Sequence, residues 1–309
     1  MRRLFSLLVL AMASVLTATA AKNVWKAKHV LLIGIDGWGA YSVPKAHDIP
    51  NIRGLMDSGC YTLKKRCVLK SESAVNWASM FNGAPTEIHG YTNWNSRVPE
   101  IPSMVTNRNG IFPTIFSILR EQCPKAVTGC IAEWDGIKYL VDSLAIDYVD
   151  VASNYEKDSM QLCRMAVKYI KEKKPTFFAV CYDQVDHVGH AIGHDTPAYY
   201  DVLARVDKQV GLLVQALKDA GIYDDTIIIV TADHGGIGTS HGGQTLLEME
   251  VPFIISGKNV RQGQEITDVV IQYDTAATIA DIFGLKCPQA WRGVPIESVF
   301  KWKYGTCKR

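Results

Sequence analysis

Four short runs of apolar and β-branched residues, separated by amphipathic stretches, constrain the fold of this chain more than any other feature. The runs are HVLLIGI (29–35), TFFAVCY (176–182), TIIIVTA (226–232) and PFIIS (252–256), with a weaker one, AVTGCIA, at 126–132. Runs of this kind are typical of strands buried on both faces. The amphipathic stretches at 112–121, 157–172 and 196–220 predict helices. The alternation predicts an α/β fold, with a mostly parallel central sheet and helices on both faces.

The first twenty residues have the pattern of a signal peptide. A basic pair at 2–3 precedes an apolar run at 4–12, and small residues at 18–20 resemble a signal peptidase site. The run is too short to span a bilayer, and we expect no transmembrane segment elsewhere. We therefore expect a protein exported to the periplasm or secreted, with residues 21–309 forming a single domain.

Charge and cysteine content exclude some functions. The chain has 33 basic residues, two of them in the expected signal peptide, against 31 acidic ones, so binding to a nucleic-acid polymer is not expected. None of the eight cysteines forms a Cys-x-x-Cys motif, so neither a thiolate zinc site nor a redox motif is indicated. Local disulfides are conceivable for the pairs 60/67, 123/130 and 287/307, whereas Cys163 and Cys181 are expected to be buried thiols.

Acidic and imidazole side chains follow three of the predicted strands. Asp36 follows the first, Asp183 and Asp186 follow the run at 176–182, and Asp233 and His234 follow the run at 226–232. In open α/β sheets the carboxyl ends of parallel strands lie together and form the ligand crevice. The sequence therefore predicts that these side chains meet at one edge of the sheet.

The segment DHVGH at 186–190 has the spacing of a metal-binding helix. On a helix, Asp186 and His190 share one face and can bind one cation. The alternative interpretation is a capped helix start with an exposed histidine.

The segment ADHGGIGTSHGG at 232–243 adds a second set of ligands. Adjacent Asp233 and His234 can serve two neighbouring sites, and His241 returns after a glycine-rich turn. The glycines let the backbone pass close to a ligand, although an ordinary flexible loop is the alternative.

Together these residues predict a centre with two metal ions. Asp36 alone is more typical of a turn, but with the other clusters it becomes a candidate ligand. Three aspartates and three histidines exceed the four ligands of one tetrahedral site, so two ions fit better than one. The mixed nitrogen and oxygen donors favour zinc, with manganese or iron as alternatives.

Ser73 is the candidate nucleophile. It precedes a stretch, Ala74 to Phe81, that predicts a helix, and a serine there is usually a plain N-cap. The same position offers backbone amides and the positive end of the helix dipole, which favour a bound phosphate. Asn76, one turn later, is expected to donate its amide to a phosphate oxygen.

As a set, these motifs resemble the alkaline phosphatase superfamily, and within it the type I phosphodiesterase/nucleotide pyrophosphatase branch. The resemblance covers nearly the whole chain after residue 20 and rests on IDGWG, SAVNW, GAPTEIHGYTNW, VDHVGH and ADHGGIGTSHGG, in that order. Ser73 and Asn76 match the branch pattern of Thr or Ser followed three residues later by Asn. The resemblance implies a metallo-hydrolase that acts on a small phosphorylated substrate, such as a nucleotide or another phosphodiester.

Carried over by position, the resemblance implies the ligands of each metal and the course of the reaction. One metal is then held by Asp186, His190 and His241, and the other by Asp36, Asp233, His234 and the Ser73 oxygen. A phosphoryl-serine intermediate at Ser73 follows from the same resemblance. Asp183 is left out because Asp186 matches the spacing of the branch.

The chain departs from the branch at two positions, and other reactions stay open. Trp77 stands where the branch often has His, and His194 stands where it usually has Pro. A phosphomonoesterase, a phosphonate hydrolase or a phosphoethanolamine-type transferase would use the same fold. A non-enzymatic metal-containing binding protein is a further alternative. No Cys/Ser-x-Pro-x-Arg motif is visible, which disfavours a sulfatase.

Overall fold

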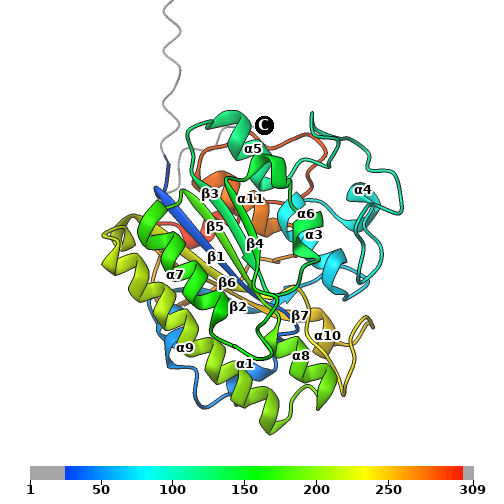
Figure 1. The fold of residues 1–309 in the computed structure, drawn as a ribbon, viewed down its shortest axis with the longest axis vertical. Coiled ribbons are helices and arrows are strands. Elements are labelled where there is room, and N and C mark those ends of the chain that lie inside the picture. Colours follow the sequence, from blue (N-terminus) through cyan, green and yellow to red (C-terminus); the bar gives the residue numbers. More distant parts are fainter. Residues whose placement is uncertain (1–24, 302–309) are drawn as a thin grey trace, which may run out of the picture.

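The computed structural model describes residues 25–301, which form one eight-stranded sheet covered by helices (Figure 1). The strands are β1 (His29–Ile35), β2 (Gly59–Arg66), β3 (Thr128–Ala132), β4 (Tyr148–Val151), β5 (Phe177–Tyr182), β6 (Thr226–Thr231), β7 (Glu250–Gly257) and β8 (Gln264–Glu265). The helices are α1 (Ser42–Lys45), α2 (Pro50–Asp57), α3 (Ser73–Asn82), α4 (Thr86–His89), α5 (Ile115–Gln122), α6 (Ile137–Leu140), α7 (Gln161–Lys173), α8 (Gln184–Ala191), α9 (Pro197–Asp219), α10 (Leu246–Met249) and α11 (Asp274–Ile282). The expected signal peptide lies outside the described residues. Among those described, no helix has the length and apolar character to cross a membrane.

The strand order is β4-β3-β5-β1-β6-β7-β2-β8. β1 pairs in parallel with β5 and β6, whereas β7 runs antiparallel to both of its neighbours, β6 and β2. The predicted fold class, a mostly parallel sheet between helices, is confirmed. The sequence did not predict β2, whose GCYTLKKR sequence carries three bases in its last three positions and therefore lacks an apolar run.

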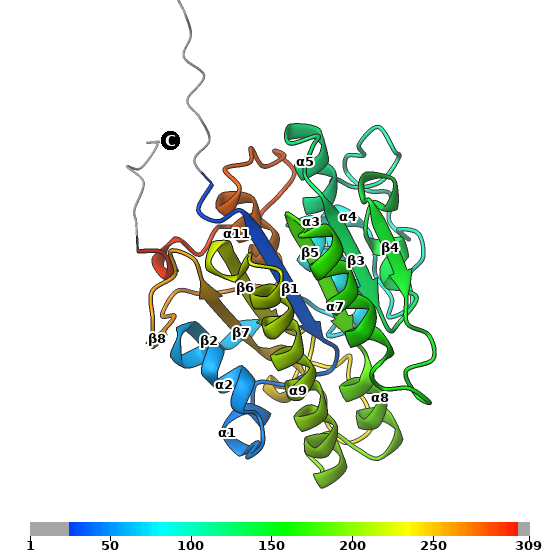
Figure 2. The same ribbon diagram turned by 60° about the vertical axis from the view of Figure 1, so that its left-hand side comes forward.

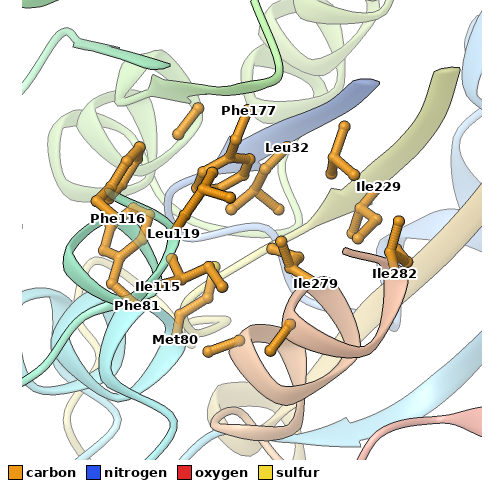
Figure 3. Close-up of a cluster of buried hydrophobic side chains, with 14 of the residues drawn as sticks. Leu32, Met80, Phe81, Ile115, Phe116, Leu119, Phe177, Ile229, Ile279 and Ile282 are labelled. Carbon is orange, nitrogen blue, oxygen red and sulfur yellow. The ribbon is translucent and has the colours of Figure 1, made fainter. Parts of the chain in front are cut away.

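The core forms two layers because successive residues of a strand face opposite sides of the sheet. Val30 and Leu32 of β1 pack against α3, α5 and α11, whereas Leu31 and Ile33 pack against α2, α7 and α9. Figure 3 shows the first layer, which contains phenylalanines from α3, α5 and β5 together with aliphatic side chains of β1 and α11. Burial on both sides explains why β1 is apolar along its whole length.

Local capping sets the helix boundaries. The predicted helix at 112–121 begins only at Ile115, because Thr114 and Ser117 form a reciprocal capping box. α9 begins at Pro197, where Thr196 accepts a hydrogen bond from the Tyr199 amide. Each of the three predicted helices is therefore present with shifted ends.

Two of the suggested disulfides do not form. Cys60 and Cys67 are free thiols. Cys60 is the second residue of the extended strand β2 and Cys67 directly follows its end, so a rise of about 3.3 Å per residue separates them by more than a disulfide can span. Cys123 and Cys130 are also free, as are the buried Cys163 and Cys181. The partner suggested for Cys287 lies outside the described residues.

The parallel strands point toward the end of the molecule where α8 lies (Figure 2). Asp36 follows β1 directly, α8 follows β5, and Asp233 and His234 come two and three residues after the end of β6. The sheet thus delivers acidic and imidazole side chains from three strands to one edge.

Candidate active site

A first group of atoms that could hold a metal ion comes from α8 and from the loop after β6. Ligand atoms of Asp186, His190 and His241 lie within 4.8 Å of one another. His190 Nε2 is 3.1 Å from Asp186 Oδ2 and 3.1 Å from His241 Nε2. Asp186 and His190 share a face because they stand four residues apart on the helix.

The histidine tautomers show which ring nitrogens are available to a metal. In all three expected histidine ligands Nδ1 faces a backbone carbonyl oxygen, at 3.0 Å in His190 (Thr239), 2.9 Å in His241 (Ser71) and 2.8 Å in His234 (Gly235). A carbonyl oxygen only accepts hydrogen bonds, so Nδ1 carries the proton and Nε2 presents a lone pair. This is the usual arrangement of a metal-ligating histidine.

The two Nε2 atoms of His190 and His241 fit around a cation. Two lone pairs that face each other at 3.1 Å repel unless a positive charge lies between them. Nitrogens bound at about 2.0 Å to a tetrahedral zinc ion lie ~3.3 Å apart, close to this distance. Without a metal, the hydrogen bond to Asp186 raises the pKa of His190 to about 9. A proton on His190 then supplies the positive charge between the two nitrogens.

A second group lies next to the first and shares Asp186 with it. Ligand atoms of Asp36, Asp186 and His234 lie within 4.8 Å of one another. His234 Nε2 is 3.3 Å from Asp36 Oδ1 and 3.3 Å from Asp233 Oδ2. Asp36 and Asp233 each have one buried carboxylate oxygen without a hydrogen bond, and the buried Asp186 Oδ1 faces His194 Nε2 at 3.4 Å. Buried polar atoms nearly always have a partner, and divalent cations would supply it here.

The electrostatics of the site also favour cations. Burial raises the pKa of Asp36 well above its ordinary value, and the nearby Asp233 and Asp186 raise it further. Burial and Asp186 together raise the pKa of Asp233 to about 7. Burial alone would raise the pKa of Asp186, but hydrogen bonds from His190 and His194 bring it below its usual range. Three buried carboxylates that repel one another are stabilised by positive charge.

Ser73 lies at the edge of the second group. It is the first residue of α3, directly after the N-cap residue Glu72, and its Oγ is 3.1 Å from His234 Nε2. The next backbone amide, of Ala74, donates to the carbonyl oxygen of Trp94 at 3.1 Å. The start of α3 therefore places a hydroxyl group beside the metal-ligating atoms.

Asn76 does not have the surroundings of a phosphate ligand, which corrects the role expected from the sequence. Its side chain is fully buried. Its Oδ1 accepts from the Val68 amide at 2.7 Å, and its Nδ2 donates to the carbonyl oxygens of Val68, Lys70 and Glu72. Asn76 holds the segment 68–72 that leads to Ser73. No donor is left for a substrate.

Trp77 is a contributor to the site that the sequence reasoning missed. Its Nε1 donates to Asp36 Oδ2 at 2.9 Å, and its side chain is buried. The indole lies over Gly34 of β1, where an added Cβ would come within 2.2 Å of the ring. The available signal was the position of Trp77 four residues after Ser73, on the same helix face. Of the other aromatic residues near the nucleophile motif, Tyr91 is buried and Trp94 is exposed.

Gly37 of the IDGWG motif allows the backbone to approach both groups. Its φ is +67°, and a Cβ there would lie 2.5 Å from Asp186 Oδ1. Its amide donates to Asp233 Oδ1 at 3.2 Å. Asp183, which the sequence reasoning left out, belongs to neither group and accepts a hydrogen bond from the Tyr155 hydroxyl.

An α/β sheet with Asp and His side chains converging beside a serine at a helix start defines the class of alkaline phosphatase-like proteins. A family model described as type I phosphodiesterase / nucleotide pyrophosphatase matches residues 30–276. The chain belongs to this family, which is part of the alkaline phosphatase superfamily.

Individual relatives share shorter segments or the fold. Arylsulfatase K of Canis lupus familiaris is 29% identical over 112 residues, 34% of this chain and 21% of that protein. The venom phosphodiesterase CdcPDE of Crotalus durissus collilineatus is 25% identical over 220 residues, 67% of this chain and 26% of that protein. The chain thus spans about a quarter or less of the length of these curated relatives.

A solved structure shows the same fold over most of the chain. Murine ectonucleotide pyrophosphatase/phosphodiesterase 5, an inactive variant in complex with AMP, superposes with a TM-score of 0.72 at 14% identity. The match covers 89% of this chain and 100% of that one. At this identity the likeness concerns the fold.

Proposed function

We propose that the protein hydrolyses phosphoric diesters, nucleotide esters among them, with two zinc ions and with Ser73 as the nucleophile. The observation that carries the proposal is the Ser73 Oγ, 3.1 Å from a His234 nitrogen that belongs to the second group of ligand atoms. A serine that served only as a helix cap would have no reason to face such a group. Membership of the phosphodiesterase family and the AMP bound by the structural neighbour support a nucleotide substrate.

Two metal sites account for the converging side chains. Asp186, His190 and His241 would form the first metal site, and Asp36, Asp233, His234 and the Ser73 oxygen would form the second. The buried carboxylate oxygens without hydrogen bonds and the facing Nε2 lone pairs fit this assignment. Bound divalent ions in such a pair of sites supply positive charge for the oxygens that attack and leave phosphorus.

The groups of the chain itself have defined parts in the reaction. Ser73 Oγ forms a bond to phosphorus while the bond from phosphorus to the leaving oxygen breaks, and the Ser73 proton passes through solvent to that oxygen, which leaves as the alcohol. The phosphoryl group is thereby held as an ester of Ser73. Water then attacks phosphorus from the vacated side, the bond to Ser73 Oγ breaks, and a proton from the attacking water restores the serine hydroxyl. The start of α3 faces the phosphate with the positive end of its dipole.

Charge near Ser73 favours a diester over a monoester. A monoester brings roughly two negative charges and a diester one. Glu72 precedes Ser73 and has a buried carboxylate oxygen without a hydrogen bond. The nearest base in sequence, Lys70, has an exposed side chain, and its Nζ lies 3.8 Å from Glu72 Oε1. A carboxylate at this position repels the doubly charged monoester more strongly than the singly charged diester.

We also propose that the protein acts outside the cytoplasm. The proposal rests on the basic pair, apolar run and small residues of the first twenty positions. Fractionation of the native host cell, with the mature N-terminus sequenced, tests it. A mature chain that still begins at residue 1 inside the cytoplasm would contradict the proposal.

The test of the proposed function compares two serines of α3. Ser73→Ala removes the nucleophile, whereas Ser79→Ala removes a buried hydroxyl that bonds Val75 and His89 away from the site. With nitrophenyl thymidine phosphate as substrate, Ser73→Ala should lower kcat by about 1000-fold or more, and Ser79→Ala should affect mainly stability. Zinc content, measured on the same samples, should stay near two per chain in the Ser79 variant. Near-normal turnover by Ser73→Ala would contradict the assignment of the nucleophile.

A further inference from the structure

His194 is a buried histidine beside the first metal site that the assignments above leave without a role. It lies three residues after the end of α8, and its side chain is inaccessible to solvent. Its Nε2 is 3.4 Å from Asp186 Oδ1, the oxygen that does not face His190. Both oxygens of the Asp186 carboxylate are thus in contact with imidazole nitrogens.

The ring of His194 is held in a narrow space. An added Cβ on Gly189 of α8 would lie 2.4 Å from Nε2, and one on Gly236 of the loop after β6 would lie 2.3 Å from it. The Tyr199 ring packs against the imidazole with a centroid distance of 5.6 Å. The ring fits because both neighbouring residues are glycines, so its nitrogens have one fixed direction.

His194 also binds the loop that carries His241. Its backbone amide donates to the Gly238 carbonyl oxygen at 2.7 Å, which also brings Nδ1 to 3.2 Å from that oxygen. The carbonyl oxygen already has this amide donor, whereas Asp186 Oδ1 only accepts, so we assign the ring proton to Nε2. His190 contacts the adjacent carbonyl, of Thr239. The two histidines therefore connect the end of α8 to residues 238 and 239, three and two residues before His241.

We propose that His194 is a positioning residue for the first metal site: its Nε2–H fixes the Asp186 carboxylate, and its backbone amide holds the loop of His241. The inference rests on the proposed metal-dependent function. Neither group of converging ligand atoms includes His194, so we assign it a role beside the ligands rather than among them. Groups that orient a ligand typically change metal affinity by about 10- to 100-fold when they are lost.

Two substitutions separate the role of Nε2 from that of Nδ1. In His194→Gln the amide nitrogen can occupy the place of Nε2 and still reach Asp186, whereas in His194→Asn it can replace only Nδ1. Zinc affinity is measured by titrating metal-free protein against a chromophoric chelator, which resolves two binding steps. His89→Asn is the matched control, because His89 is also buried and its Nε2 contacts Ser79 far from the ligands.

His194→Asn should weaken one of the two zinc-binding steps by about 10-fold or more, and His194→Gln should stay within about 3-fold of the wild type. His89→Asn should lower the unfolding temperature and leave both zinc affinities unchanged. Unchanged affinity in His194→Asn, or an equal loss in the Asn and Gln variants, would overturn the positioning role. A wild-type protein that binds no zinc would overturn the proposed function itself.

Discussion

The carboxylate of Asp36 accepts a hydrogen bond of 2.9 Å from the indole nitrogen of Trp77. The bond joins the first strand of the fold to the helix that begins with Ser73, so the proposed nucleophile and a proposed ligand of the second metal site are positioned together. Asp36 Oδ1, the other oxygen, has no hydrogen bond and faces His234 at 3.3 Å. The indole thus determines which oxygen is free for a metal.

Trp77→Phe keeps an aromatic ring at this position but removes the indole donor, together with the distal part of the indole that lies over Gly34. We expect zinc affinity at the second site to fall by about 10-fold, because the orienting partner of a ligand is lost. Trp291→Phe is the control, since Trp291 Nε1 donates to the Pro113 carbonyl oxygen away from the site. Equal zinc affinities in the two variants, measured by chelator competition, would show that the indole does not orient Asp36.

His241→Ala should remove one metal ion and leave the other. The proposed second site keeps all its ligands in this variant, so elemental analysis should give close to one zinc per chain and about two in the wild type. His29→Ala is the control, because His29 Nδ1 also faces a carbonyl oxygen, that of Pro175, but belongs to neither group. Two tightly bound zinc ions in His241→Ala would refute the assignment of this ligand.

Glu72→Gln should reduce discrimination against monoesters. Removing one negative charge beside Ser73 relieves the repulsion of a dianion by about 1 kcal/mol more than that of a monoanion. This difference corresponds to roughly a 5-fold change in relative kcat/KM. The ratio of kcat/KM for nitrophenyl thymidine phosphate to that for nitrophenyl phosphate should fall accordingly. Glu87→Gln, an exposed change on α4, should leave this ratio unchanged. A wild-type enzyme that prefers the monoester would reject the diester proposal itself.

Lys65 makes the free energy of unfolding depend on pH in the alkaline range. Burial lowers its pKa to about 7, whereas the unfolded chain has a pKa of about 10.4. Between these values the unfolded state binds the extra proton, so the free energy of unfolding rises with pH in this interval. Below pH 7 Lys65 is protonated in both the folded and the unfolded state, so the cost of burying its charge no longer changes with pH and is at its largest.

Lys65→Met should therefore stabilise the protein at pH 7 by about 2–4 kcal/mol and lose most of this advantage near pH 10. Urea unfolding at several pH values measures the effect. Lys64→Met, an exposed change on the same strand, should show no such trend. An advantage that is independent of pH would mean that Lys65 carries no buried charge.

The sequence predicted those parts of the fold and site that depend on local pattern. β1, β5 and β6 were predictable because strands buried on both faces must be apolar throughout. The strand ends then placed Asp36, Asp186 and Asp233 at one edge of the sheet. The spacing of four residues predicted that Asp186 and His190 would share a face of α8.

Features that depend on packing between distant segments were not predictable. Asn76 was expected to reach a phosphate, yet the preceding segment folds over it and uses all its hydrogen-bonding atoms. Trp77 was regarded as a departure from the family, because its contact with Asp36 exists only once α3 packs against β1 at Gly34. His194 acquires its contact with Asp186 through a turn after α8 that no local pattern indicates.

The two-step displacement at Ser73 is tested most directly by the stereochemistry at phosphorus. A phosphorothioate diester of known configuration, hydrolysed in heavy-oxygen water, gives a chiral product whose configuration phosphorus NMR determines. Each in-line displacement inverts phosphorus, so attack by Ser73 followed by attack by water should give net retention. Net inversion would mean that water attacks the substrate directly, and it would contradict Ser73 as the nucleophile.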